Sequence, residues 1–194
     1  MKTTMKRPSS EIYAVIMCML LFVVGGVKAQ ERIYSIDAFT EKKTDIQKRA
    51  LMSRTAMQDI SGDRINAFRN LYYNVQPARY YNAIETRSAN EGSYPSVLFV
   101  NPSAFSRLEA DVNDESNENF STVKLIVIDG QLGVALPSFF TNDEKFPELE
   151  FLVFKSNAGA GTMNASSTES LLSKAFWEAR PDVVVVFNNL EAGN

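Results

Sequence analysis

LEFLVFKS at 149–156 and RPDVVVVF at 180–187 enclose SSTESLLSKAFWEA at 166–179, and this unit decides the fold. The two outer segments are short apolar runs of branched and aromatic residues, which are typical of buried strands. Between them, Ser166 and Glu169 fit the two ends of a helical capping box. The apolar residues of one helical face are Leu171, Leu172, Ala175, Phe176 and Ala179. The order strand, helix, strand predicts parallel pairing with a right-handed crossover.

Two upstream runs, at 97–100 and 123–128, have the same character as those at 149–154 and 183–187. Their near-continuous apolarity indicates strands covered on both faces. We therefore predict an α/β fold with a mostly parallel sheet of about four strands.

Residues 44–89 have helical periodicity, which predicts N-terminal helices packed on that sheet. Apolar residues recur at helical spacing before and after a break at 61–63, where Gly62 is expected to end one helix and Asp63 to begin the next. One or two further helical turns are expected after Pro77, carrying Tyr80 and Tyr81. The predicted organisation is a helical region at 30–93 and an α/β region at 94–194, packed together as one domain.

Residues 1–29 have the parts of a secretory signal peptide in the required order. The positive residues at its start are Lys2, Lys6 and Arg7. The apolar run at 12–24 is shorter than the ~20 residues a membrane-spanning helix needs, and VKA at 27–29 suits a signal peptidase. We expect cleavage before Gln30, export, and no stable membrane anchor. The alternative is that the segment stays attached as an anchor.

The sequence contains no histidine, and its only cysteine, Cys18, lies in the predicted signal peptide. The mature chain therefore has no Ser-His-Asp triad, no thiolate nucleophile, no disulfide, and no zinc site made of His or Cys. The acidic segment at 111–119 lacks the glycine and final glutamate of a calcium loop, since Ser116 and Thr122 stand there. The segment SNAGAGT at 156–162 lacks a nucleotide-binding glycine pattern. We expect no metal and no cofactor.

Without the signal peptide, the chain carries 16 basic and 22 acidic residues. This net negative charge argues against nucleic acid as a partner. The charge is uneven, because residues 30–93 are slightly basic and residues 94–194 are strongly acidic.

Two sets of residues are candidate sites. Asp129 follows the run at 123–128, at the strand end where α/β ligand sites gather, and would act as a carboxylate with Asp182, Glu191 or Lys155. The alternative is an Asp-Gly turn with no chemical role. Tyr80 and Tyr81 belong to a tyrosine-rich patch with arginines nearby, which is either a ligand-binding surface or a helical layer packed on the sheet. The members of that patch are Tyr72, Tyr73, Tyr80, Tyr81, Arg69, Arg79 and Arg87.

The strand-like runs begin after YPS at 94–96, FST at 120–122, FPE at 146–148 and RPD at 180–182, at intervals of 26, 26 and 34 residues. With LPSFF at 136–140 followed by FPELEF at 146–151, residues 94–189 resemble leucine-rich repeat proteins. The resemblance implies a short curved solenoid whose exposed strand positions, here Lys124 and Glu150, bind a partner. A compact three-layer α/β domain is the alternative.

These exclusions favour an exported, non-catalytic binding or protein–protein interaction protein of the bacterial periplasm or cell surface. Its partner would be a protein or an envelope component. The alternative is a carboxylate-based hydrolase acting on envelope glycans or esters, with Asp129 and Asp182 as its candidate residues.

Overall fold

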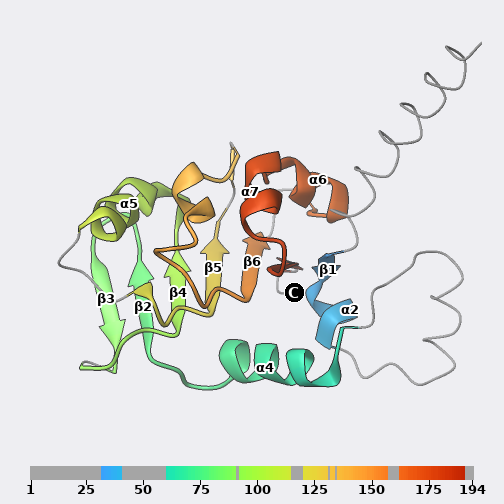
Figure 1. Ribbon diagram of the computed structural model, residues 1–194, viewed down its shortest axis with the longest axis horizontal. Helices are drawn as coiled ribbons and strands as arrows, with labels where there is room; N and C mark the ends of the chain where they lie inside the picture. The colour runs from blue at the N-terminus through green and yellow to red at the C-terminus, as the bar shows by residue number, and fades with distance from the viewer. Residues whose placement is uncertain are drawn as a thin grey trace, which may run out of the picture.

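The computed structural model describes residues 32–40, 60–90, 92–114, 120–130, 132–133, 135–156 and 162–190. It shows an α/β fold built on one seven-stranded sheet (Figure 1). The strands are β1 (Ile33–Ser35), β2 (Ala78–Tyr81), β3 (Thr86–Ala89), β4 (Val97–Val100), β5 (Leu125–Asp129), β6 (Phe151–Ser156) and β7 (Val184–Asn189). The α-helices are α2 (Ile36–Thr40), α4 (Gly62–Tyr73), α5 (Phe105–Asn113), α6 (Ala165–Ser170) and α7 (Lys174–Ala179). The 3-10 helices with described bounds include η1 (Pro102–Ala104) and η3 (Ser138–Thr141).

The strand order is β1-β7-β6-β5-β4-β2-β3. All neighbours pair in parallel except β2 and β3, which form an antiparallel hairpin. The predicted parallel pairing around the 166–179 helix is confirmed, because β6 and β7 are parallel neighbours in the register Phe154↔Phe187.

The prediction of about four strands was too low. The four apolar runs became β4 to β7, and three more strands come from the region 30–93 that we expected to be helical. Tyr80 and Tyr81 lie in β2 and not in a helical turn. The hairpin strands β2 and β3 are short and carry exposed polar residues, so the apolar pattern that identifies a strand is absent from them.

The second predicted N-terminal helix is confirmed as α4, with a different first turn. Its N-cap is Ser61, whose hydroxyl accepts the N–H of Arg64, and Gly62 begins the helix. Asp63 lies inside the first turn, where a carboxylate also suits the positive helix end. The expected earlier helix lies almost entirely outside the described residues.

Helices cover both faces of the sheet, as Figure 1 shows with α4 on one side and α5 and α7 on the other. Ile126 and Ile128 of β5 point toward the side of α5 and α7, together with Leu108 and Phe176 of those helices. Alternate residues of β5, such as Val127, point toward α2 and α4. Each of these β5 side chains is fully buried, which stabilises the fold by roughly 1.5–3 kcal/mol per residue.

The crossover between β6 and β7 is two short helices and not the single helix that the sequence suggested. Asn164, rather than Ser166, is the N-cap of α6, and it forms the capping box with Ser167. The chain then turns, and the Ser173 hydroxyl accepts the N–H of Phe176 to start α7. A second capping serine therefore divides the apolar stretch whose spacing predicted one helix.

The structure shows no solenoid. β4 to β7 do lie near one another in the sheet, but in the sheet centre both faces of each strand are covered. The resemblance to leucine-rich repeat proteins stays a prediction.

Candidate functional site

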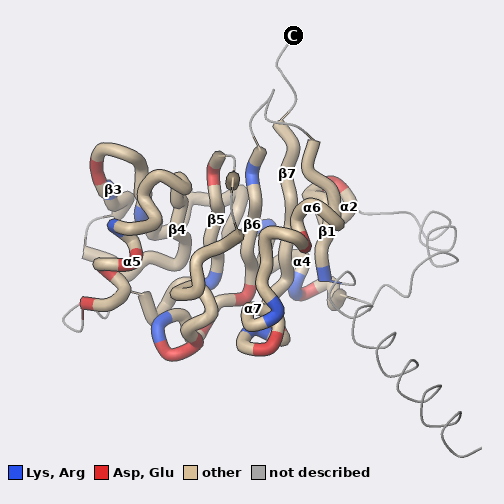
Figure 2. The backbone as a smooth tube through the Cα atoms, turned by 90° about the horizontal axis from the view of Figure 1, so that it is seen from above, with Lys and Arg blue, Asp and Glu red and all other residues tan. Residues whose placement is uncertain are grey.

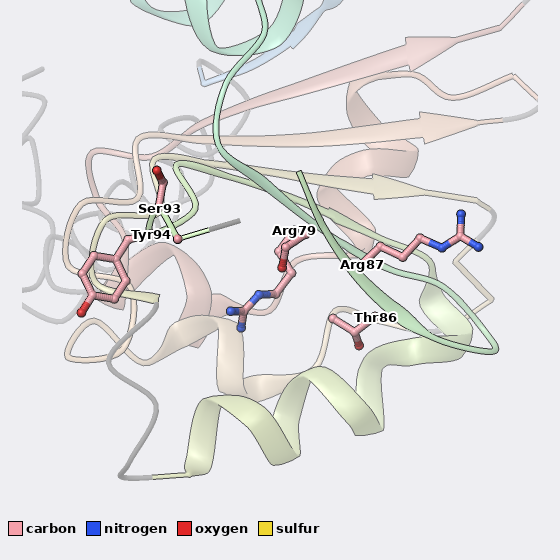
Figure 3. Close-up of a pocket in the computed structure, with 7 residues that line it drawn as sticks. Arg79, Thr86, Arg87, Ser93 and Tyr94 are labelled. Carbon is pink, nitrogen blue, oxygen red and sulfur yellow. The ribbon is translucent and has the colours of Figure 1, made fainter. Parts of the chain in front are cut away.

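A groove of about 720 Å³ lies against the hairpin at the end of the sheet. We call it the β2–β3 groove, and its lining residues are Arg79, Thr86, Arg87, Ser88, Gly92, Ser93 and Tyr94. Figure 3 shows Arg79 in the middle of this set, with Tyr94 and Thr86 on either side of it.

The register of the hairpin places these side chains together. Arg79 pairs with Ser88 and Tyr81 pairs with Thr86, so these four side chains project from the same face of the sheet. Arg87 pairs with Tyr80 and projects from the opposite face, which agrees with its different direction in Figure 3.

Two turns shape the ends of the groove. Between β2 and β3, the Asn82 side-chain oxygen accepts the N–H groups of Ile84 and Glu85, which closes the hairpin. After β3, Asn90 and Gly92 have φ angles of 61° and 91°. Backbone of this hand favours Asn and Gly, and it turns the chain from β3 toward β4 past Ser93 and Tyr94.

Arg79 lies beside a buried tyrosine, close enough to act on the ionisation of the Tyr81 hydroxyl. That hydroxyl donates to Asp111 Oδ2 at 2.8 Å. Arg79 Cζ also lies 5.7 Å from the centre of the Phe120 ring, within cation–π range. Burial raises the pKa of Tyr81, and the hydrogen bond to Asp111 raises it further while Arg79 opposes the change.

Two of the described residues that line the groove, Arg79 and Arg87, are positively charged. None of the described residues that line it is acidic, and Arg79 forms no ion pair within the part of the chain that the structure describes. Arg87 is different, because it pairs with Glu85. Arg79 is thus the cation available to a ligand, and its planar fork suits carboxylate, sulfate or phosphate. The hydroxyls of Thr86, Ser88, Ser93 and Tyr94 add donors and acceptors.

Asp129 lies at the carboxyl end of β5 as predicted, and the structure brings it together with Lys155. Lys155 Nζ lies 3.0 Å from Asp129 Oδ2. In Figure 2 the acidic end of β5 lies beside the basic end of β6. Asn101 Nδ2 donates to the Asp129 carbonyl at 3.2 Å, and Gly130 has a φ of 133°, a conformation that favours glycine. The alternative Asp-Gly turn stays a prediction, because residue 131 lies outside the described residues.

Asp182 does not lie beside Asp129. Lys155 pairs with Asn188 in the sheet, and Asp182 precedes β7 at the other end of that strand. At ~3.3 Å per residue, about 20 Å of strand separates the two levels. This is beyond the ~5–10 Å between the carboxylates of a glycosidase. Glu191, the other proposed partner, lies outside the described residues.

Lys124 and Glu150 lie side by side at the amino ends of β5 and β6. Lys124 Nζ is 3.9 Å from Glu150 Oε1 and 3.5 Å from Glu148 Oε2. Lys124 thus forms ion pairs with both glutamates on the surface. Such exposed ion pairs contribute little to stability.

The two candidate tyrosines point to opposite faces of β2. Tyr81 is 1% exposed and belongs to the core. Tyr80 is 40% exposed and stacks on Phe99, with ring centres 4.8 Å apart. The predicted tyrosine and arginine patch is therefore split: Arg79 and Tyr81 meet at the groove, and Arg69 and Tyr72 lie in α4 on the other face.

Among the residues that the structure describes, no three Asp or Glu side chains gather as a metal site. Within the same ranges, no helix has the length and apolarity to cross a bilayer. The segments 157–161 and 115–119, which contain most of the glycine loop and half of the acidic segment, lie outside the described residues, as does the predicted signal peptide.

No protein-family model, curated protein or solved structure matches this chain.

Sequence reasoning named Arg79 and Arg87 but missed the rest of the groove. The missed lining residues are polar, and no apolar pattern in the sequence around them marks a strand. They are Thr86, Ser88, Ser93 and Tyr94. The available signal was spacing: YYNAIETRS at 80–88 alternates around a short turn, as a hairpin does.

Proposed function

We propose that this chain is an exported, non-catalytic binding protein of the bacterial periplasm or cell surface, and that the β2–β3 groove binds an anionic partner. One observation carries the proposal: Arg79 is half-buried, packed over the Phe120 ring, and in no ion pair with a described carboxylate. A cation fixed in this way loses little side-chain entropy when a ligand binds.

The site has the composition of a binding site. Hydroxyls and arginine line an open groove, and the described lining residues include no carboxylate that would act as a general acid or base. Export follows from the signal peptide, and envelope polymers and proteins that carry carboxylates would meet the chain in that compartment.

The test is a titration of the mature chain, residues 30–194, with polygalacturonate as a polyanion and dextran as a neutral polymer. We expect polygalacturonate to bind and dextran not to bind. Arg79→Gln should lower the affinity about 10-fold or more, because a hydrogen bond to a charged group contributes roughly 1.5–3 kcal/mol. Arg69→Gln, which removes the same charge from α4, is the matched control and should change the affinity less than about 2-fold.

Equal affinities of the Arg79→Gln and Arg69→Gln proteins would place binding elsewhere. No binding of polygalacturonate by the wild-type chain would reject an anion site of this kind altogether.

A carboxylate-based hydrolase is the second candidate, favoured by the meeting of Asp129 and Lys155 at the carboxyl edge of the sheet. The test is turnover of envelope glycans and esters by the wild-type chain and by Asp129→Asn. Turnover that the substitution abolishes would support the hydrolase, and turnover that it leaves unchanged would remove Asp129 from the reaction.

A further inference from the structure

The outer edge of β3 has backbone groups that pair with no other strand among the residues that the structure describes. β3 is the last strand in the order of the described sheet, next to β2. The Asn82 N–H donates to the Glu85 carbonyl at 3.2 Å, so these residues form a hydrogen-bonded pair. Because hydrogen-bonded pairs alternate along an antiparallel ladder, Thr86 and Ser88 direct their N–H and C=O groups away from β2.

These outward groups have the spacing of a strand. Thr86 and Ser88 are two residues apart, about 7 Å along the edge, which is the repeat of an extended polypeptide. Both residues are exposed, and their side chains lie on the groove face of the sheet. An incoming strand would therefore gain backbone hydrogen bonds at the edge and side-chain contacts in the groove.

We propose that the anionic partner is an acidic, extended polypeptide segment that adds antiparallel to β3. This inference rests on the proposed function, because it uses the same groove. The residues opposite Thr86 and Ser88 exchange backbone hydrogen bonds with them and direct their side chains to the groove face. Arg79 pairs with Ser88 and so lies on β2, one strand inside the edge. Its side chain is within reach of a glutamate that pairs with Ser88 from the other side.

Charge selects an acidic segment over a second copy of this chain. A symmetric antiparallel β3–β3 pair that used the outward groups of both Thr86 and Ser88 would be centred on Arg87. It would set the Arg87 side chains of the two copies directly opposite each other, and like charges in this position destabilise a strand pair. Glutamates of an incoming segment instead face Arg79 on the groove side of the sheet.

The test uses a capped, fluorescein-labelled peptide of about nine residues in which Glu and Val alternate, beside polygalacturonate as a non-peptide polyanion. Ser88→Pro removes the outward N–H and leaves the β2–β3 hydrogen bonds intact, because those come from Arg87 and Ala89. Ser88→Ala keeps the N–H and is the matched control. We expect Ser88→Pro to weaken peptide binding about 10-fold or more relative to Ser88→Ala. The two variants both lack the Ser88 hydroxyl, so their affinities for polygalacturonate should equal each other.

A second measurement uses the wild-type chain and so does not depend on how the proline variant folds. The peptide N-methylated at its Glu residues should bind about 10-fold more weakly than the peptide N-methylated at its Val residues. This difference follows because the Glu residues, on the groove face, direct their backbone N–H groups toward β3.

The outcomes separate the two proposals. Equal binding of the two N-methylated peptides would overturn strand addition, and the proposed function would stand if Arg79→Gln still weakened polygalacturonate binding. If neither probe bound the wild-type chain, both proposals would be rejected.

Discussion

Arg180 shows how one buried cation holds a segment of irregular chain. It is 5% exposed, and its guanidinium donates to the carbonyls of Phe140, Asn142 and Phe146. Burial lowers the pKa of Arg180, and the nearby Asp143 opposes this change. The side chain thus ties the end of α7 to η3 and to the segment between η3 and β6.

Arg180→Met should therefore lower the free energy of unfolding by about 3 kcal/mol, because it leaves several buried carbonyls without a donor. Arg107→Met is the control, since Arg107 also donates to two carbonyls, of Asn82 and Ala83, at a more exposed place. Its expected cost is below about 1 kcal/mol. Urea unfolding followed by the fluorescence of Trp177 measures both, and equal costs would contradict the role of burial.

Tyr81 should make the fold sensitive to alkali. Burial raises the pKa of Tyr81 above the ordinary value near 10. Above pH 10 the unfolded chain therefore loses the phenolic proton while the folded chain keeps it, and the free energy of unfolding falls as the pH rises. The limit for one proton is about 1.4 kcal/mol per pH unit.

Urea titrations between pH 8 and pH 11.5 test this dependence in the wild-type chain and in Tyr81→Phe. The variant cannot ionise at this position, so its stability should fall less steeply above pH 10. Parallel curves for the two proteins would contradict the prediction.

Among the elements, α6 begins at a capping box formed by Asn164 and Ser167. The Asn164 side chain accepts the Ser167 N–H at 2.9 Å, and the Ser167 hydroxyl lies 2.9 Å from the Asn164 N–H, which it accepts in return. Loss of such a cap typically costs about 1 kcal/mol.

Asn164→Ala should accordingly destabilise the chain by about 1 kcal/mol, whereas Ser166→Ala, two residues away and exposed, should change stability by less than about 0.5 kcal/mol. Thermal unfolding compares the two variants. A larger loss of stability in Ser166→Ala than in Asn164→Ala would instead support the capping box of Ser166 and Glu169 that the sequence suggested.

The elements also show what was predictable from sequence. β4 to β7 were found because strands buried on both faces need apolar residues at every position, and such runs are visible in isolation. β2 and β3 were missed because Arg79 is half-buried and Thr86 and Ser88 are exposed, so no apolar run marks these strands. The meeting of Asp129 and Lys155 was anticipated from the rule for strand ends. The β2–β3 groove was not, since only the hairpin register brings Arg79 to Ser88.

For the whole molecule, the predicted export can be tested on the natural precursor. Secretion should remove residues 1–29, and the recovered chain should have the mass of residues 30–194 with Gln30 at its start. An N-terminus upstream of residue 12 in the recovered protein would show that the apolar segment is retained. Membrane fractionation in the same experiment distinguishes a released chain from an anchored one.

The pairing of β1 with β7 constrains the order in which the molecule assembles. Ile33 of β1 lies just after the predicted cleavage site, and it is the register partner of Val185 in β7, about 150 residues later in the sequence. In the predicted export, a chain that leaves the pore amino end first would keep β1 without its neighbouring strand until Val185 had also passed through. Closing so long a loop is slow. The same delay would keep the predicted precursor unfolded before it crosses a membrane.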